Sequence, residues 1–111
     1  MINGLKVLFG AILALMLYVT ISASLDRGVF TAGRALWPDP WFRATLADAY
    51  CGFLAVYAWV FYRERSWDAR GAWFVAIMGL GNIAIAAYVL ARLFRLPPGA
   101  GAEELLLRPR A

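Results

Sequence analysis

The stretch ATLADAYCGFLAVYAWVFY, from Ala44 to Tyr62, is almost unbroken in its apolar and aromatic residues and contains one acid, Asp48. It lies between Arg43 and Arg63 and is long enough to cross a bilayer, for which a helix needs about 20 apolar residues. An acid inside such a segment is costly unless it is paired or faces a polar environment. The stretch therefore predicts a membrane-spanning helix whose carboxylate needs an explanation.

Two further apolar stretches flank this one and carry no charged residue, at about residues 7–25 and 71–91, the second ending at Arg92. The composition agrees, because 63% of the 111 residues are hydrophobic and the mean hydropathy is +0.66. Ordinary globular domains are only about half apolar. We predict an all-α integral membrane protein with three transmembrane helices, at about residues 7–25, 44–62 and 71–92.

The short charged turn from Arg63 to Arg70 predicts that the second and third helices form an antiparallel hairpin. Small residues lie at helical spacing on both, and such residues let helices approach closely in lipid. They are Ala47, Cys51 and Ala55 on the second helix, and Ala72, Ala76, Gly79 and Ala86 on the third. We interpret these stripes as the seam of the hairpin, with a dimer interface as the alternative.

The segment LPPGAG at residues 96–101 cannot continue a helix because of its prolines and glycines. We predict a three-helix membrane domain at residues 1–96 and a short flexible polar tail at residues 97–111. A cleaved signal peptide is the alternative for the first helix, since Ser22-Ala23-Ser24 resembles a cleavage site. The apolar run is, however, longer than the usual signal core of about 7–15 residues.

The formal net charge is +4, and the lysines and arginines lie at the ends of the predicted helices rather than on one soluble face. We interpret them as anchors at the membrane interface and expect no nucleic-acid partner. With three spans, the first loop and the tail carry more of them than the N-terminal lead and the second loop. The positive-inside rule then favours an N-terminus outside and a C-terminus inside, in the inner or plasma membrane if the source is bacterial.

The chain has no histidine and one cysteine, Cys51. The usual haem ligand, the usual general base and the commonest metal ligand are therefore missing. No pattern of a phosphate-binding loop, a hydrolase nucleophile elbow or a zinc protease is present. We expect no enzymatic activity, no catalytic residues, no metal and no cofactor.

One group of polar residues could carry chemistry. If the hairpin folds about Ser66 or Trp67, Asp48 lies level with Ile85, and Asn82 lies one turn deeper. The polar end of the first helix falls in the same leaflet. The candidate cluster consists of Asp48, Asn82, Arg92, Thr20 and Tyr88.

Two interpretations of Asp48 remain open. In the first interpretation it is a packing residue, bonded to a hydroxyl or to Asn82, or paired with Arg92 at the interface. In the functional interpretation it lines a small polar pocket and binds a proton, a cation or a lipid headgroup.

Several motifs resemble domain-of-unknown-function family 1475, a family of small helical membrane proteins. They are ATLADAY at residues 44–50, Trp59, Tyr62-Arg63-Glu64, Trp67, Trp73, GNIA at residues 81–84 and Tyr88. A second uncharacterised family of similar layout, domain-of-unknown-function family 2834, matches less well. The resemblance implies an integral membrane protein in which Asp48, Asn82 and the turn residues Glu64 and Trp67 hold family positions. It implies no activity, cofactor or partner.

We therefore expect an accessory or scaffold subunit of a membrane complex, or a homo-oligomer, whose surroundings are the lipid bilayer. The alternative is a minimal transporter or lipid-handling protein that uses the polar cluster around Asp48.

Overall fold

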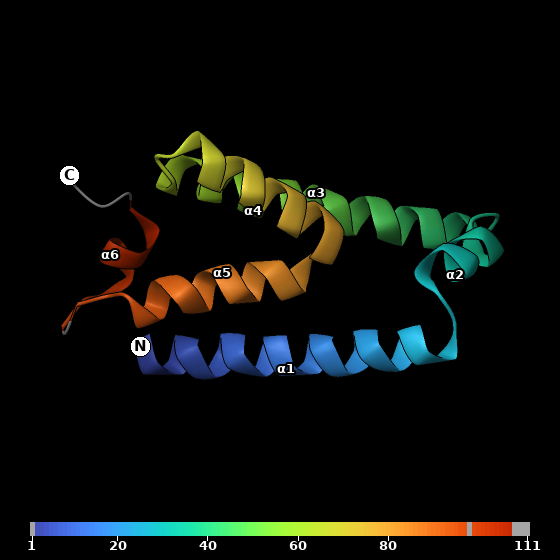
Figure 1. Ribbon diagram of the computed structural model, residues 1–111, viewed down its shortest axis with the longest axis horizontal. Coiled ribbons are helices and arrows are strands. Elements are labelled where there is room, and N and C mark those ends of the chain that lie inside the picture. The colour runs from blue at the N-terminus through green and yellow to red at the C-terminus, as the bar shows by residue number, and fades with distance from the viewer. Residues whose placement is uncertain (1, 98, 108–111) are drawn as a thin grey trace.

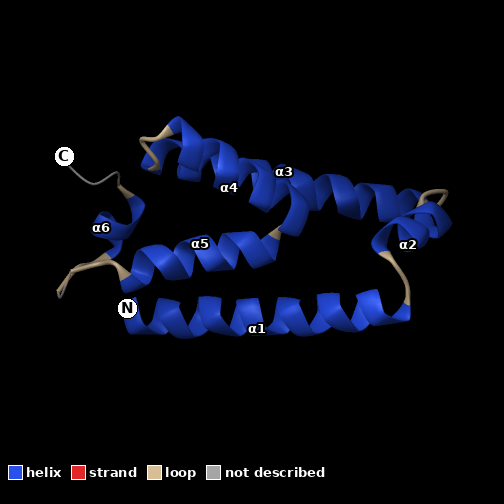
Figure 2. Cartoon of the chain, viewed as in Figure 1, coloured by secondary structure: helices blue, strands red, loops and turns tan. Residues whose placement is uncertain are grey.

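The computed structural model of the protein describes residues 2–97 and 99–107. This part of the chain contains six helices and no strand, so the predicted all-α class is confirmed (Figure 2). The helices are α1 (Ile2–Asp26), α2 (Val29–Leu36), α3 (Pro40–Arg63), α4 (Trp67–Leu80), α5 (Asn82–Phe94) and α6 (Ala102–Leu106).

The long helices form layers around α5, which lies between α1 on one side and α3 with α4 on the other (Figure 1). The short helix α2 joins α1 to α3 at one end of the molecule. The N-terminal end of α1, the α3–α4 turn and α6 lie at the other end. We call this second end the terminal end.

Local signals fix the start of α3 and of α4. Asp39 accepts a hydrogen bond from the Trp41 backbone N–H at 2.9 Å, and Pro40 takes the first helical position. Ser66 accepts one from Ala69 at the start of α4. Short polar side chains such as these suit the N-cap position, because they accept hydrogen bonds from the free backbone N–H groups of the first turn.

The hairpin of α3 and α4 is antiparallel. The Tyr50 hydroxyl donates to the Met78 carbonyl at 2.9 Å, and the Tyr57 hydroxyl donates to the Arg70 carbonyl at 3.0 Å. Residues later in α3 therefore lie opposite residues earlier in α4. The seam is aromatic, and the predicted small-residue seam is wrong: Ala47, Cys51 and Ala55 on α3 are all exposed.

The prediction of one continuous third helix at residues 71–92 is also wrong, because the chain breaks at Gly81. This residue has φ 59° and ψ −125°, a conformation that essentially only glycine adopts. A Cβ at Gly81 would also lie 2.7 Å from Cζ of Phe53, so a larger residue would have to displace that ring. The chain reverses here, and α5 returns toward the terminal end (Figure 1).

The break changes the number of helices that could cross a membrane. The two pieces, α4 and α5, have 14 and 13 residues, or about 20 Å each, against a hydrocarbon core of about 30 Å. In the described residues, two helices are long and apolar enough to span by length and composition, α1 and α3.

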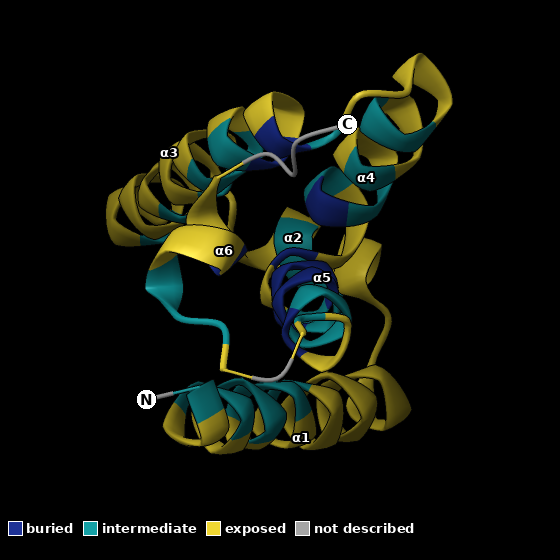
Figure 3. Ribbon diagram, turned by 90° about the vertical axis from the view of Figure 1, so that its left-hand side faces the viewer, coloured by how far each residue is buried: buried dark blue, intermediate teal, exposed yellow. Residues whose placement is uncertain are grey.

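The buried side chains come mainly from α5, as the dark ribbon in Figure 3 shows. The core cluster consists of Val60, Ile77, Ala84, Ile85, Tyr88, Val89, Leu93 and Leu105. Most other large apolar side chains lie on the surface, and α1 has no buried residue. The accessible surface is 7735 Å², whereas a folded soluble monomer of 12.3 kDa exposes about 6,100 Å².

The segment after α5 includes the short helix α6, which packs on the core. Leu105 is 6% exposed, and Nε1 of Trp59 donates to the Leu106 carbonyl at 2.9 Å. The Glu104 carboxylate accepts a hydrogen bond from the Gly101 N–H, which lowers the pKa of Glu104. Of the predicted tail, residues 98 and 108–111 lie outside the described residues.

Candidate functional site

A cluster of charged and aromatic side chains lies at the terminal end, where α3 ends and α5 passes beneath it. The Tyr88 hydroxyl donates to Oε1 of Glu64 at 2.9 Å, and Nη2 of Arg92 forms an ion pair with the same oxygen. The Arg92 guanidinium also lies over the Tyr88 ring, 5.1 Å from its centre. With Arg63, which precedes Glu64, we call these four residues the arginine cluster.

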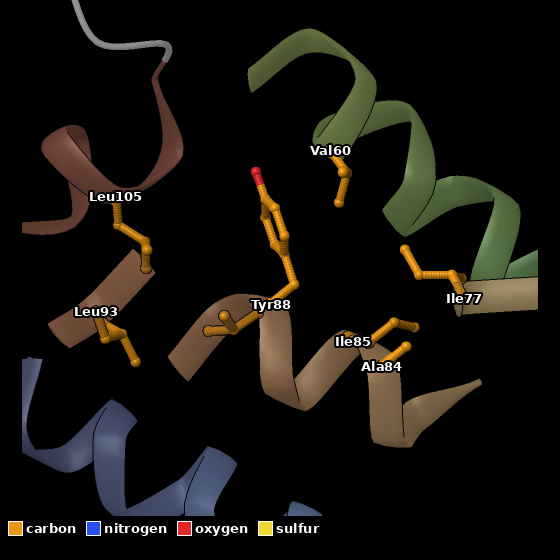
Figure 4. Packing of buried hydrophobic residues seen from close by; sticks show 8 residues of the cluster. Val60, Ile77, Ala84, Ile85, Tyr88, Leu93 and Leu105 are labelled. Atoms are coloured by element: carbon orange, nitrogen blue, oxygen red, sulfur yellow. The ribbon is translucent and has the colours of Figure 1, made fainter. Parts of the chain in front are cut away.

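Two tryptophans hold Tyr88 in place. Trp59 on α3 and Trp73 on α4 pack edge to face against its ring, with centres 5.5 and 4.8 Å away. Figure 4 shows the Tyr88 hydroxyl pointing from α5 into the space between Val60 and Leu105. Because aromatic rings have few rotamers and Tyr88 is fully buried, the hydroxyl has one defined position.

The cluster contains more positive than negative charge. Arg63 is only 6% exposed, and within the described part of the chain its Nε has no hydrogen-bond partner. Nε of Arg92 is likewise buried without a partner. The Glu64 carboxylate is paired with Arg92 and acts on Arg63 only through its charge, and the two guanidinium groups repel each other. A buried charge without a partner is strongly unfavourable, so Arg63 requires an explanation.

Capping of α3 does not provide that explanation, because another arginine performs it. Nε of Arg70 donates to the carbonyls of Phe61 and Glu64, at 3.0 and 2.9 Å. Its guanidinium lies 4.0 Å from the ring centre of Phe61 and 4.8 Å from that of Trp67. The free carbonyls at the end of α3 are thus bound by Arg70 rather than by Arg63.

The structure divides the predicted polar cluster into three parts. Tyr88 and Arg92 lie together in the arginine cluster. Thr20 and Asn82 line a shallow hollow of about 240 Å³ beside the break at Gly81. Asp48 is exposed on α3, does not line the hollow and has no part in the arginine cluster.

The register of the hairpin explains the position of Asp48. Since Tyr50 lies opposite Met78, Asp48 lies level with about Leu80, at the end of α4. Beyond Gly81 the chain reverses, so α5 carries Tyr88 and Arg92 away from Asp48 toward the terminal end.

The two predicted turn residues have different positions. Glu64 turns inward and is the acceptor of the arginine cluster, whereas Trp67 is 73% exposed and packs on Phe61 and Arg70. Sequence reasoning missed Arg63 as part of a site. The spacing of Tyr88 and Arg92, four residues apart, put these two on one helix face but gave no signal for Arg63.

No group of three or more histidine, cysteine, aspartate or glutamate side chains that could hold a metal occurs among the described residues. The arrangement instead offers guanidinium donors beside a rigid aromatic wall. Such donors bind anions with oxygen atoms, because their planar fork matches carboxylate and phosphate geometry.

The fold and the cluster define a small all-α protein with two helices suited to a membrane and a buried basic site near one end. The chain belongs to the family described as Protein of unknown function (DUF1475), whose sequence model matches residues 1–107. The predicted family resemblance is thereby confirmed. Neither a curated protein nor a solved structure matches the chain.

Proposed function

We propose that this protein is an integral membrane protein with two spans, α1 and α3, and that α4 and α5 enter and leave the bilayer from the same side. Support comes from the lengths of the helices and from the reversal at Gly81. Helical pairs that end inside the membrane are tolerated where neighbouring protein covers them. Here α5 lies between α1 and the α3–α4 pair.

This topology puts both ends of the described chain on one side. The terminal end carries Lys6, Arg63, Arg65, Arg70, Arg92 and Arg95, and the opposite end carries Arg27, Arg34 and Arg43. The positive-inside rule then puts the terminal end in the cytoplasm. This orientation replaces the one expected from three spans, which separated the two termini.

The role that we propose is that of an accessory or scaffold subunit, held in a larger membrane complex or a homo-oligomer, without enzymatic activity. The observation that carries it is the outer face of α3, which consists of Ala44, Asp48, Cys51, Gly52 and Ala55. All five are exposed, and they recur at helical spacing. A Cβ on Gly52 would meet nothing within 4 Å.

The acid on this face makes a lipid-facing position unfavourable. An aspartate in a membrane helix costs roughly 2.5–3.5 kcal/mol at the bilayer centre and less near the ends. A second helix that approaches across the small residues removes Asp48 from lipid and supplies a donor to its carboxylate. The outer face of α3 therefore fits a partner helix better than it fits acyl chains.

The experiment is affinity purification of the full-length protein from its own membranes in a mild detergent, followed by mass spectrometry. We expect a stoichiometric partner, or self-association, that Gly52→Leu reduces at least tenfold. Ala14→Leu, a matched change on the exposed surface of α1, should have no effect. A monomer without partners, or equal behaviour of the two variants, contradicts the proposal.

The alternative, a minimal transporter or lipid-handling protein that uses Asp48, predicts a different result. Asp48→Asn would then abolish the cellular function and leave the assembly intact. For an accessory subunit, Asp48→Asn weakens the assembly and the function together, because the amide bonds a partner less strongly than the carboxylate does.

A further inference from the structure

We propose that Arg63 and Arg92 form a binding site for a phosphate-class oxyanion at the terminal end of the molecule. The starting point is the burial of Arg63, whose side chain is only 6% exposed. Its Nε has no hydrogen-bond partner in the described chain. Nε of Arg92 is in the same state. Two buried N–H groups on neighbouring cations thus lack an acceptor.

The acids nearby are already engaged. Oε1 of Glu64 accepts from both Tyr88 and Arg92. On α6, the Glu104 carboxylate accepts from the Gly101 N–H at 2.7 Å. No ion pair joins Arg63 to a carboxylate of the described residues. The described part of the chain therefore leaves one positive charge of the cluster uncompensated.

The charge and geometry of the cluster select the ligand. Two guanidinium groups and one carboxylate leave a net charge of +1, which a monoanion neutralises. A phosphodiester or dihydrogen phosphate carries that charge and offers several acceptor oxygens to planar N–H donors. The Tyr88 hydroxyl already donates to Glu64, so its part is to fix that carboxylate rather than to bind the anion.

Two sources could supply this chemistry, the headgroup of an anionic phospholipid and free phosphate. Arg63 is the last residue of α3, so in the two-span topology the cluster lies near headgroup level. Only the lipid source depends on the proposed membrane insertion. Binding of inorganic phosphate in detergent does not, and the two proposals can therefore fail separately.

The test uses the purified full-length protein in a neutral detergent. Trp59 and Trp73 touch Tyr88 and so report on the cluster by fluorescence. Inorganic phosphate is titrated first, then phosphatidylglycerol in mixed micelles, with phosphatidylcholine as the zwitterionic control. We expect saturable binding of phosphate or phosphatidylglycerol that Arg63→Gln weakens at least tenfold.

Arg43→Gln is the matched control, because it removes the same charge from the exposed opposite end of α3. It should leave the affinity unchanged. Arg63→Lys keeps the charge and loses the planar fork, so we expect an intermediate affinity; this variant decides the matter if Arg63→Gln does not fold.

Saturation by phosphatidylglycerol alone assigns the site to a lipid headgroup, and saturation by phosphate assigns it to the free anion. The proposal is overturned if the wild-type protein binds neither. It is also overturned if Arg63→Gln and Arg43→Gln weaken binding equally, or if Arg63→Lys binds as the wild type does.

Discussion

The Tyr88 hydroxyl donates a hydrogen bond to the Glu64 carboxylate at 2.9 Å, which fastens the middle of α5 to the turn between α3 and α4. Arg92, one helical turn further along α5, bonds the same carboxylate oxygen. The second half of α5 is thus fixed by charge and hydrogen bonding, and its start is fixed by the sharp turn at Gly81.

Glu64 should contribute more to stability than Tyr88 does. Glu64→Ala leaves both Arg92 and the Tyr88 hydroxyl without an acceptor, which should lower the free energy of unfolding by about 3 kcal/mol. Tyr88→Phe removes one bond to a charged group and should cost about 1.5 kcal/mol. Denaturation in detergent, followed by circular dichroism, measures both. A larger loss for Tyr88→Phe would contradict the assignment of Glu64 as the shared acceptor.

Replacing Arg63 by methionine should stabilise the protein when no phosphate is present. Removing a buried, uncompensated charge and filling its place with an apolar side chain is neutral or favourable, by about 1–2 kcal/mol here. Arg92→Met should instead destabilise, because it leaves Glu64 without its cation. Thermal unfolding in phosphate-free buffer compares the two variants. Loss of stability in Arg63→Met would show that Arg63 is a structural residue.

Alanine substitutions at Gly79 and Gly81 should change the free energy of unfolding in opposite directions. Gly81→Ala combines positive φ with a Cβ 2.7 Å from Phe53, and should cost about 1–3 kcal/mol. At Gly79, inside α4, a Cβ would meet nothing within 4 Å, so alanine should gain about 1 kcal/mol of helix stability. Measured side by side, equal effects of the two changes would mean that the chain does not reverse at Gly81.

The attachment of α6 should depend on Trp59 and Leu105. Trp59→Phe removes the donor to the Leu106 carbonyl, and Leu105→Ala removes a side chain that is 6% exposed. Either change should increase the rate of trypsin cleavage after Arg95, because a detached α6 leaves the preceding segment open to the protease. Leu107→Ala, at an exposed side chain, serves as the control. An unchanged rate in both test variants would argue against a docked α6.

The sequence predicted α1 and α3 because their apolar runs continue for a full membrane thickness. It did not predict the break at Gly81, because hydropathy carries no information about backbone dihedral angles. In addition, the residues on both sides of the break are equally apolar. A second error concerned the register: folding the hairpin about Ser66 or Trp67 put Asp48 level with Ile85, whereas the Tyr50–Met78 hydrogen bond puts it level with about Leu80. The partners Tyr88 and Arg92 were named, but Glu64 was interpreted as a turn residue and Arg63 as an interface anchor. Their inward position depends on how α5 returns beneath the hairpin, which is a tertiary feature.

The most direct test of this account asks on which side of the membrane the end of α5 emerges. In a Cys51→Ala background, single cysteines replace Ala35, Asp68 or Ala100, and a membrane-impermeant maleimide is added to sealed vesicles of known orientation. The two-span account predicts that the cysteines at positions 68 and 100 react from one side and the cysteine at position 35 from the other. Reaction at position 100 from the side opposite to position 68 would mean that a third helix crosses the membrane, and would contradict the account.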